Sequence, residues 1–203
     1  MERKTLYWTL GLTIVGLLVL AKMSSGPRSS SSTQNTAPAM TDKWRMSESR
    51  SPMDDSVIVI ASLDSEDKIN GPVQSTQPTL MIRCKEKKTE VYLVTGVAAS
   101  IETSYGGGMK CYHTVRIRLD REEPTLTAWD DSTDHHTLFL RSLTLDPMSF
   151  HDAVPFAKQL SKASTLTLEF TPFDSSPATV RFDLRGGESH VTKVGEACGW
   201  SLE

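Results

Sequence analysis

The residues best equipped for chemistry in this sequence follow Trp129 directly. Three carboxylates and two imidazoles fall within seven residues: Asp130, Asp131, Asp134, His135 and His136. These groups are ligands of zinc and manganese, so one hypothesis is a metal-dependent hydrolase that uses residues 130–136. Adjacent histidines on an extended strand point to opposite faces, however, whereas a mononuclear site needs ligands that converge. Turns stabilised by aspartates are the simpler explanation. We therefore interpret residues 129–136 as a solvated loop that leads into a strand at 138–140, and we assign no metal ligand.

Two further pairs of residues could react only in a suitable environment. Asp54 and Asp55 could form an acid–base pair, but Ser56 and an apolar run follow them, which favours a turn. Cys111 and His113 are a poor nucleophile and base, because they lie two apart on a strand and no third group orients them. His113 has the parity of an apolar strand face, so we expect a hydrogen-bonded histidine in the core or at a strand end. The sequence predicts no catalytic residue and no cofactor.

The N-terminal part of the chain does not have the pattern of a globular domain. Sixteen residues without a charge run from Leu6 to Ala21, after Arg3 and Lys4. A helix that crosses a bilayer needs about 17–25 apolar residues, whereas the core of a signal peptide needs about 7–15. We interpret residues 1–23 as an uncleaved membrane anchor, with a cleaved signal peptide as the alternative. Residues 24–43 are rich in serine and proline, and they predict a flexible linker.

Residues 44–203 have the composition of a single soluble domain. The whole chain carries 22 basic and 25 acidic residues, for a net charge of −3. The charges are interspersed, and no basic stripe could neutralise a run of phosphates. Nucleic acid is therefore not an expected partner.

Alternating apolar and polar residues predict that this domain consists mainly of β-strands. The plainest run is Val115, Ile117 and Leu119, which alternates with charged residues. Glycines 106–108 lack the lysine and the following helix of a phosphate-binding loop, and they indicate a hairpin tip. The spacing of runs and turns predicts an α+β fold that is mainly antiparallel β. We expect a twisted sheet or sandwich-like core with one or two short helices packed on it.

Two segments have helical signals. Asp and Pro at 146–147 could cap a helix, but Pro155 interrupts the apolar stripe that follows. That helix either kinks at Pro155 or begins at Val154. A second short helix is predicted from about residue 188 to residue 198.

The three cysteines predict one disulfide bond if the domain is exported. Three pairings are open to the sequence. Cys84 lies on the apolar face of its strand, and Cys198 would tie the C-terminus to that strand, so we favour Cys84–Cys198. Cys111 lies near a strand end and would be the unpaired thiol. The alternative is a cytosolic protein with three reduced cysteines.

Several short segments occur in an order that matches one protein family. They are Ser51-Pro52-Met53-Asp54-Asp55-Ser56, Leu80-Met81-Ile82-Arg83-Cys84, Trp129 with Ser132-Thr133-Asp134, Phe170-Thr171-Pro172-Phe173, Phe182-Asp183-Leu184 and Ala197-Cys198-Gly199-Trp200. Together they cover about residues 44–200 and resemble the VasI/TagO family of type VI secretion-associated proteins. The family's N-terminal cysteine-containing segment is absent here. The hydrophobic segment and the serine-rich linker stand in its place, and Cys111 has no counterpart.

The resemblance implies a non-enzymatic accessory protein of the bacterial envelope. Its partner would be an unidentified protein or the cell wall, in type VI secretion, and the N-terminal segment would contact the membrane. The expected location is the inner membrane, with a single span and the domain in the periplasm. A soluble periplasmic protein is the alternative. A prophage-encoded envelope protein of the same fold is the second functional hypothesis.

Overall fold

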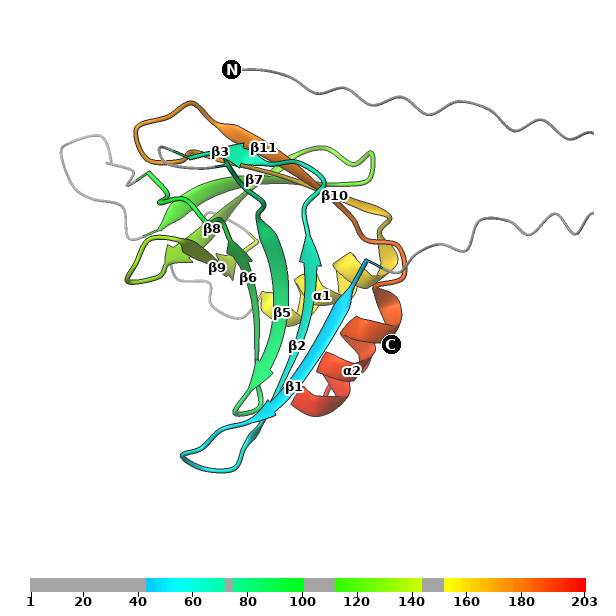
Figure 1. The fold of residues 1–203 in the computed structure, drawn as a ribbon. Helices are drawn as coiled ribbons and strands as arrows, with labels where there is room; N and C mark the ends of the chain where they lie inside the picture. The colour runs from blue at the N-terminus through cyan, green and yellow to red at the C-terminus, as the bar shows by residue number, and fades with distance from the viewer. Residues whose placement is uncertain (1–42, 72–74, 101–111, 144–151) are drawn as a thin grey trace, which may run out of the picture. The chain divides into compact units, whose positions relative to one another are not determined.

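The computed structural model of the chain describes residues 43–71, 75–100, 112–143 and 152–203 (Figure 1). Several predictions concern residues outside these ranges: the segment from Leu6 to Ala21, most of the linker, glycines 106–108, Cys111 and the pair at 146–147. They stay predictions. Within the described ranges, no helix combines the length and the apolar character needed to span a bilayer.

Among the described residues, nine strands form one antiparallel sheet in the spatial order β1-β2-β5-β6-β9-β8-β7-β10-β11 (Figure 1). In chain order they are β1 (Arg45–Arg50), β2 (Val57–Asp64), β5 (Thr79–Lys85), β6 (Lys88–Val94), β7 (His113–Leu119), β8 (Thr125–Asp131), β9 (Thr137–Ser142), β10 (Thr165–Phe170) and β11 (Ala178–Asp183). Two short strands, β3 (Ile69–Asn70) and β4 (Ser75–Thr76), pair only with each other. With two helices on this sheet, the predicted α+β fold of mainly antiparallel β-structure is confirmed.

The alternation seen in the sequence separates the core from the solvent-facing side of the sheet. In β7, Val115 and Ile117 are buried whereas Arg116 and Arg118 are exposed. Because successive side chains of a strand point to opposite faces, one apolar side chain in every two residues is enough to build the core. The buried side chains of all nine strands but β1, together with both helices, form one hydrophobic cluster.

Strand β8 corrects one prediction. Trp129, Asp130 and Asp131 belong to this strand rather than to a solvated loop, and only the residues after them form a turn. Trp129 is 0% exposed, and its Nε1 donates to Thr127 Oγ1 at 2.8 Å. A run of aspartates and histidines favours a turn locally. Pairing with β7 and β9, which are separate segments of the chain, holds the first three residues in the sheet instead.

Helix α1 (Ala153–Lys162) begins one residue before the later of the two predicted starts. Asp152 occupies its N-cap position, and Pro155 falls within the first turn. A proline is tolerated there because the first backbone N–H groups of a helix have no intrahelical acceptor. The helix buries Phe156 and Leu160 in the core.

Helix α2 (Glu188–Cys198) has the bounds that the sequence predicts. It ends at Gly199, whose φ of 84° is the left-handed conformation that glycine adopts most readily. Both helices lie on the same face of the sheet and contact each other (Figure 1). α2 packs against β2, β5 and β6, and α1 packs against β6 and β9.

The segment that follows β2 lies beside the edge strand β11. The backbone N–H of Glu66 donates to the carbonyl of Arg181 at 2.7 Å, and the backbone N–H of Arg181 donates to the carboxylate of Asp67 at 3.0 Å. Trp44 adds a hydrogen bond from Nε1 to the carbonyl of Leu184, at 3.2 Å. This edge of the sheet is therefore partly covered by the chain itself, which limits its pairing with other proteins.

Asp183, at the end of β11, provides a test by pH. Arg185 donates to it from Nε at 2.7 Å and from Nη2 at 2.6 Å, and Lys43 Nζ lies 3.3 Å away. These cations hold the pKa of Asp183 well below its ordinary value. A carboxylate whose pKa is lower in the folded state stabilises the fold above its unfolded pKa of about 3.9, and this contribution is lost as the pH falls further. Below about pH 4, we therefore expect the free energy of unfolding to fall more steeply in the wild type than in Asp183→Asn.

Urea denaturation at a series of pH values measures both slopes. The matched control is Asp174→Asn, at an exposed position in the turn between β10 and β11. This control should keep the wild-type slope. Equal slopes for wild type and Asp183→Asn would contradict the assignment.

Candidate functional site

Strands β6 and β9 are neighbours in the sheet but pair along only part of their length. Three residue pairs join them: Tyr92 with Phe139, Leu93 with Leu138 and Val94 with Thr137. Strand β6 begins earlier, at Lys88, and β9 continues to Ser142. Beyond the three pairs the two strands separate, although they continue in the same sheet.

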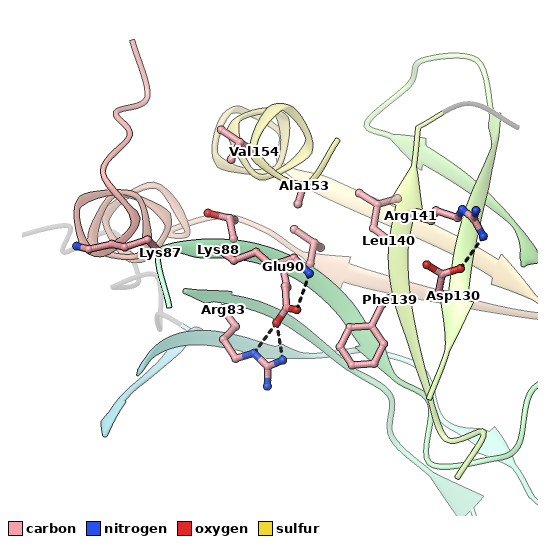
Figure 2. A pocket seen from close by; sticks show the side chains of 12 residues that line it. Arg83, Lys87, Lys88, Glu90, Asp130, Phe139, Leu140, Arg141, Ala153 and Val154 are labelled. Atoms are coloured by element: carbon pink, nitrogen blue, oxygen red, sulfur yellow. Dashed lines mark hydrogen bonds and ion pairs between the residues drawn. The ribbon is translucent and has the colours of Figure 1, made fainter. Parts of the chain in front are cut away.

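A groove of about 560 Å³ lies where the two strands separate (Figure 2). Its lining includes residues 88–91 of β6, residues 139–141 of β9, and Ala153 and Val154 at the start of α1. Figure 2 shows Ala153 projecting from the start of α1 towards the strands. The groove therefore has a β-strand on each of two sides and an apolar helix start on a third.

Ion pairs form on each side of the groove rather than across it. If the register of β6 and β9 continued, Glu90 would lie opposite Arg141. Instead, Arg83 Nε donates to Glu90 at 2.9 Å, and Arg141 Nη1 donates to Asp130 at 3.1 Å. Figure 2 shows the two pairs on opposite sides of the groove. Each acidic residue thus has a partner on its own side, so no salt bridge between Glu90 and Arg141 draws the strands together.

The C-terminal segment contacts the part of the β5–β6 hairpin where β6 does not pair with β9. Cys84 of β5 and Cys198 of α2 form a disulfide bond, with their Cα atoms 5.6 Å apart, and this is the pair favoured from the sequence. Thr89 lies opposite Cys84 in the β5–β6 hairpin, and its Oγ1 accepts a hydrogen bond from Trp200 Nε1 at 2.7 Å. These contacts fix the hairpin to the helical layer, which allows β6 to stay ordered without pairing with β9 along its whole length.

Backbone groups of β6 face the groove. The β5–β6 hairpin is closed by a two-residue turn, Glu86-Lys87, with φ values of 51° and 60°. The residues that flank such a turn form a hydrogen-bonded pair, and the direction of the backbone groups alternates along the strand from there. Lys88 therefore bonds towards β5, whereas Thr89 and Val91 direct their N–H and C=O groups towards the groove. Because Tyr92 bonds towards β5, its pairing with Phe139 places the Leu140 N–H against the Val91 C=O. In the part of the chain that the structure describes, β9 therefore accompanies β6 as far as Val91, and Thr89 has no strand beside it on this side.

Basic side chains outnumber acidic ones around the groove. The cationic residues that line it are Arg83, Lys87, Lys88 and Arg141, and the acidic ones are Glu90 and Asp130. The Lys88 side chain is 72% exposed, and its Nζ lies 3.5 Å from Glu90. The groove is therefore locally positive, although the chain as a whole has a net charge of −3.

Aromatic rings support the groove on the face of the sheet opposite the helices. Tyr92 and Phe139 are in contact, with ring centroids 5.0 Å apart. The guanidinium of Arg83 lies over the Tyr92 ring, 5.0 Å from its centroid. Burial raises the pKa of the Tyr92 phenol above its ordinary value.

The five residues considered as metal ligands have different partners in the structure and do not form one cluster. Asp131 lies between two histidines: its carboxylate contacts His135 Nδ1 and lies 3.2 Å from His113 Nε2. Asp130 faces Arg141, as described above. Asp134 accepts hydrogen bonds from Ser132 and from the backbone of His136, which makes it a turn-forming aspartate. Among the residues described, no three histidines, cysteines or carboxylates are arranged to hold a metal ion.

Other residues considered for chemistry have structural partners. Asp54 accepts a hydrogen bond from Ser56 Oγ at 2.9 Å, so the predicted turn between β1 and β2 is confirmed. His113 is 8% exposed, begins β7 and contacts the carbonyl of Ser100 at 2.8 Å through Nδ1. This is the hydrogen-bonded strand-end histidine that its parity predicts.

Of the residues that line the groove, Asp130 alone was a candidate for chemistry from the sequence, as a possible metal ligand. The charged run at 85–88 lies between two apolar alternations, which is a recognisable hairpin signal. Lys88, Arg141 and Val154, however, come from distant segments. No local pattern indicates that β6 and β9 separate, so the groove itself had no signal in the sequence.

Comparison with known families gives one result. A family model described as "Type VI secretion system VasI, EvfG, VC_A0118" matches residues 20–200 of the chain. No curated protein and no solved structure is similar enough to count as a match. The matched range includes the β-sheet, both helices and every described residue of the groove.

Proposed function

Because the chain belongs to the VasI family of type VI secretion proteins, we propose that it is a non-enzymatic accessory protein of the cell envelope that binds a protein partner in the secretion apparatus. The observation that carries the binding role is the groove between β6 and β9. It combines a positive rim with an apolar wall, which are features of a surface that recognises another polypeptide.

A non-enzymatic role is supported by how the polar side chains are used. In the described ranges, the histidines and aspartates that could do chemistry are engaged in turns, ion pairs and strand ends. The charged residues that line the groove are arginine, lysine, glutamate and aspartate, and its one described hydroxyl, that of Thr89, accepts a hydrogen bond from Trp200. Binding therefore accounts for the site with fewer assumptions than hydrolysis does.

A periplasmic location is supported by the disulfide and by the sequence that precedes the domain. Bonds such as Cys84–Cys198 form and persist in oxidising compartments, including the bacterial periplasm. The uncharged run from Leu6 to Ala21 provides an anchor or an export signal, and the serine-rich linker provides reach. We propose an inner-membrane protein whose domain lies in the periplasm.

The direct test is deletion of the gene in a strain with an active type VI system. We expect export of a secreted type VI substrate to fall to background, because the apparatus lacks an envelope partner. Plasmid-encoded full-length protein should restore export. Secretion at the wild-type level in the deletion strain would contradict the proposed function.

Fractionation of the complemented strain tests the location. We expect the intact chain in the membrane fraction, with Cys84 and Cys198 blocked to alkylation until a reductant is added. Recovery of the chain from the cytosol with all three thiols reduced would contradict the proposed location.

A further inference from the structure

We infer that the outer edge of β1 pairs with the same strand of a second copy of this chain. The pairing is antiparallel and centred on Ser49, so that Glu48 of each copy lies opposite Arg50 of the other. This inference goes beyond the proposed function and does not depend on it, because the partner at this edge is the chain itself.

Strand β1 is the open edge of the described sheet. It pairs with β2 on one side, and no described strand lies on its other side (Figure 1). The opposite edge strand, β11, is covered by Glu66 and Asp67, which bond to its backbone. Five of the six side chains of β1 are exposed, and Met46 is partly buried. Because an edge strand presents a row of unpaired N–H and C=O groups, β1 is the place where another strand can be added.

The β1–β2 hairpin determines which backbone groups of β1 point outwards. The backbone N–H of Ser51 donates to the carbonyl of Ser56 at 2.9 Å, so Ser51 bonds across the hairpin. The direction of these groups alternates along an antiparallel strand, and the register of β1 with β2 is unbroken. Ser49 therefore bonds towards β2, whereas Glu48 and Arg50 direct their N–H and C=O groups away from the sheet.

The charges of the outward-directed residues make the strand complementary to itself. Glu48 is exposed and forms no ion pair with any described residue. Arg50 is exposed as well, and among the described residues it donates only to the carbonyl of Asp55, at 3.4 Å. A two-fold axis at Ser49 places Glu48 of one copy opposite Arg50 of the other, twice in each dimer. Each such cross-strand pair of opposite charges contributes about 0.2–1 kcal/mol.

The same charges oppose the neighbouring two-fold registers. An axis at Glu48 would place two glutamates directly opposite each other, and an axis at Arg50 would do the same with two arginines. An axis at Ser47 would place Glu48 opposite Met46, without a cation. Charges on an edge strand generally discourage pairing. In β1 they discourage the other registers and favour the one centred on Ser49.

The helical layer leaves room for the paired side chains. Glu48 lies opposite Val59 in the sheet, and Val59 is buried, so Glu48 is on the face that carries the helices. On that face α2 packs against β2, β5 and β6. A groove of about 540 Å³ separates β1 from α2, and Met46, Glu48, Lys193 and Glu196 are among its lining residues. The side chains of an added strand can therefore lie beside those of β1.

The interface is small, which sets the expected affinity. A pair of short strands buries less area than a standard protein–protein interface does. We therefore expect a weak dimer, with a dissociation constant of about 10–100 μM.

Reversing one charge at a time tests the pairing. In Glu48→Arg, arginines would face each other across the axis, and in Arg50→Glu glutamates would. Each variant alone should be monomeric, whereas an equimolar mixture of the two should form a heterodimer, because the arginines of one chain face the glutamates of the other. Sedimentation velocity of the full-length protein in detergent, at about 100 μM, measures the association.

The matched controls for charge reversal are Glu123→Arg and Arg121→Glu, at exposed positions in the loop between β7 and β8. Both should dimerise as the wild type does, and circular dichroism checks that every variant is folded. A monomeric wild type, or equal association of wild type, Glu48→Arg and Arg50→Glu, would overturn the inference. Failure of the mixed variants to associate would also overturn it.

A cysteine at the axis tests the register. In the predicted dimer the two Ser49 Cα atoms form a pair without backbone hydrogen bonds, about 4.5 Å apart. This separation lies within the range of disulfide bonds. Ser49→Cys, in a Cys111→Ala background, should therefore give a covalent dimer under mild oxidation. The matched control is Ser47→Cys on the same strand and face, whose two copies would be about 14 Å apart.

Non-reducing gel electrophoresis compares the two cysteine variants, in membranes and in detergent. Ser49→Cys should cross-link at least about fivefold more than Ser47→Cys. Equal cross-linking of both variants, or none from either, would overturn the register. These measurements follow self-association directly, so their failure leaves the proposed role in secretion unaffected.

Discussion

Replacing Cys84 and Cys198 together by alanine should lower the free energy of unfolding by about 2–5 kcal/mol. The two cysteines are 114 residues apart, so their bond closes a long loop and strongly restricts the unfolded chain. In the chain-entropy model a loop of this length contributes about 4–5 kcal/mol. Urea denaturation at pH 7, followed by circular dichroism, measures the loss.

The control for this prediction is Cys111→Ala, which removes a thiol but leaves the disulfide intact. It should unfold at nearly the wild-type urea concentration. Wild-type protein treated with a reductant should resemble the double alanine variant. If the double variant were as stable as the wild type, the bond would not contribute to the fold.

The second large effect is expected from Trp129→Ala, with a loss of about 3–5 kcal/mol in the free energy of unfolding. Trp129 is 0% exposed and lies in the core, and its Nε1 donates to Thr127 Oγ1. Truncation removes buried apolar surface, creates a cavity, and deprives the buried Thr127 hydroxyl of a donor. Chemical denaturation and the near-ultraviolet circular dichroism of the remaining tryptophans report the change.

Leu126→Ala is the matched control, because Leu126 lies on the same strand but is 42% exposed. Its substitution should change stability by no more than about 0.5 kcal/mol. Equal effects of the two substitutions would show that residue 129 is not buried in the core. That result would favour the solvated loop interpreted from the sequence.

The disulfide also bears on the groove. Cys198, Trp200 and the Lys87–Ala197 hydrogen bond all attach the C-terminus to the β5–β6 hairpin. Strand β6 can therefore keep its position beside an unpaired stretch of β9. A sheet without this attachment would gain backbone hydrogen bonds if β6 and β9 closed together. The C-terminal helix thus covers the core and, through these contacts, is attached to the hairpin beside the groove.

Local patterns determined most of the individual elements. Period-two alternation predicted β7, because a strand with one buried face shows its register directly in the sequence. Helix α2 was predicted from about residue 188 to residue 198, and it runs from Glu188 to Cys198, where Gly199 ends it. For α1 the proline at 155 indicated the right region, and the helix begins at Ala153.

Contacts between distant segments decided the rest. The sequence alone placed Trp129 in a loop and grouped five residues as possible metal ligands. A short segment shows its own residue types, but it does not show which distant strands pair with it. Pairing of β8 with β7 and β9 buried Trp129 and brought Asp131 to His113 rather than to Asp134. The groove depends on where β6 stops pairing with β9 and on how α1 and α2 pack beneath them. The order of the strands, and the residue at which two strands stop pairing, depend on packing across the whole core. They therefore cannot be predicted from any single segment of the sequence.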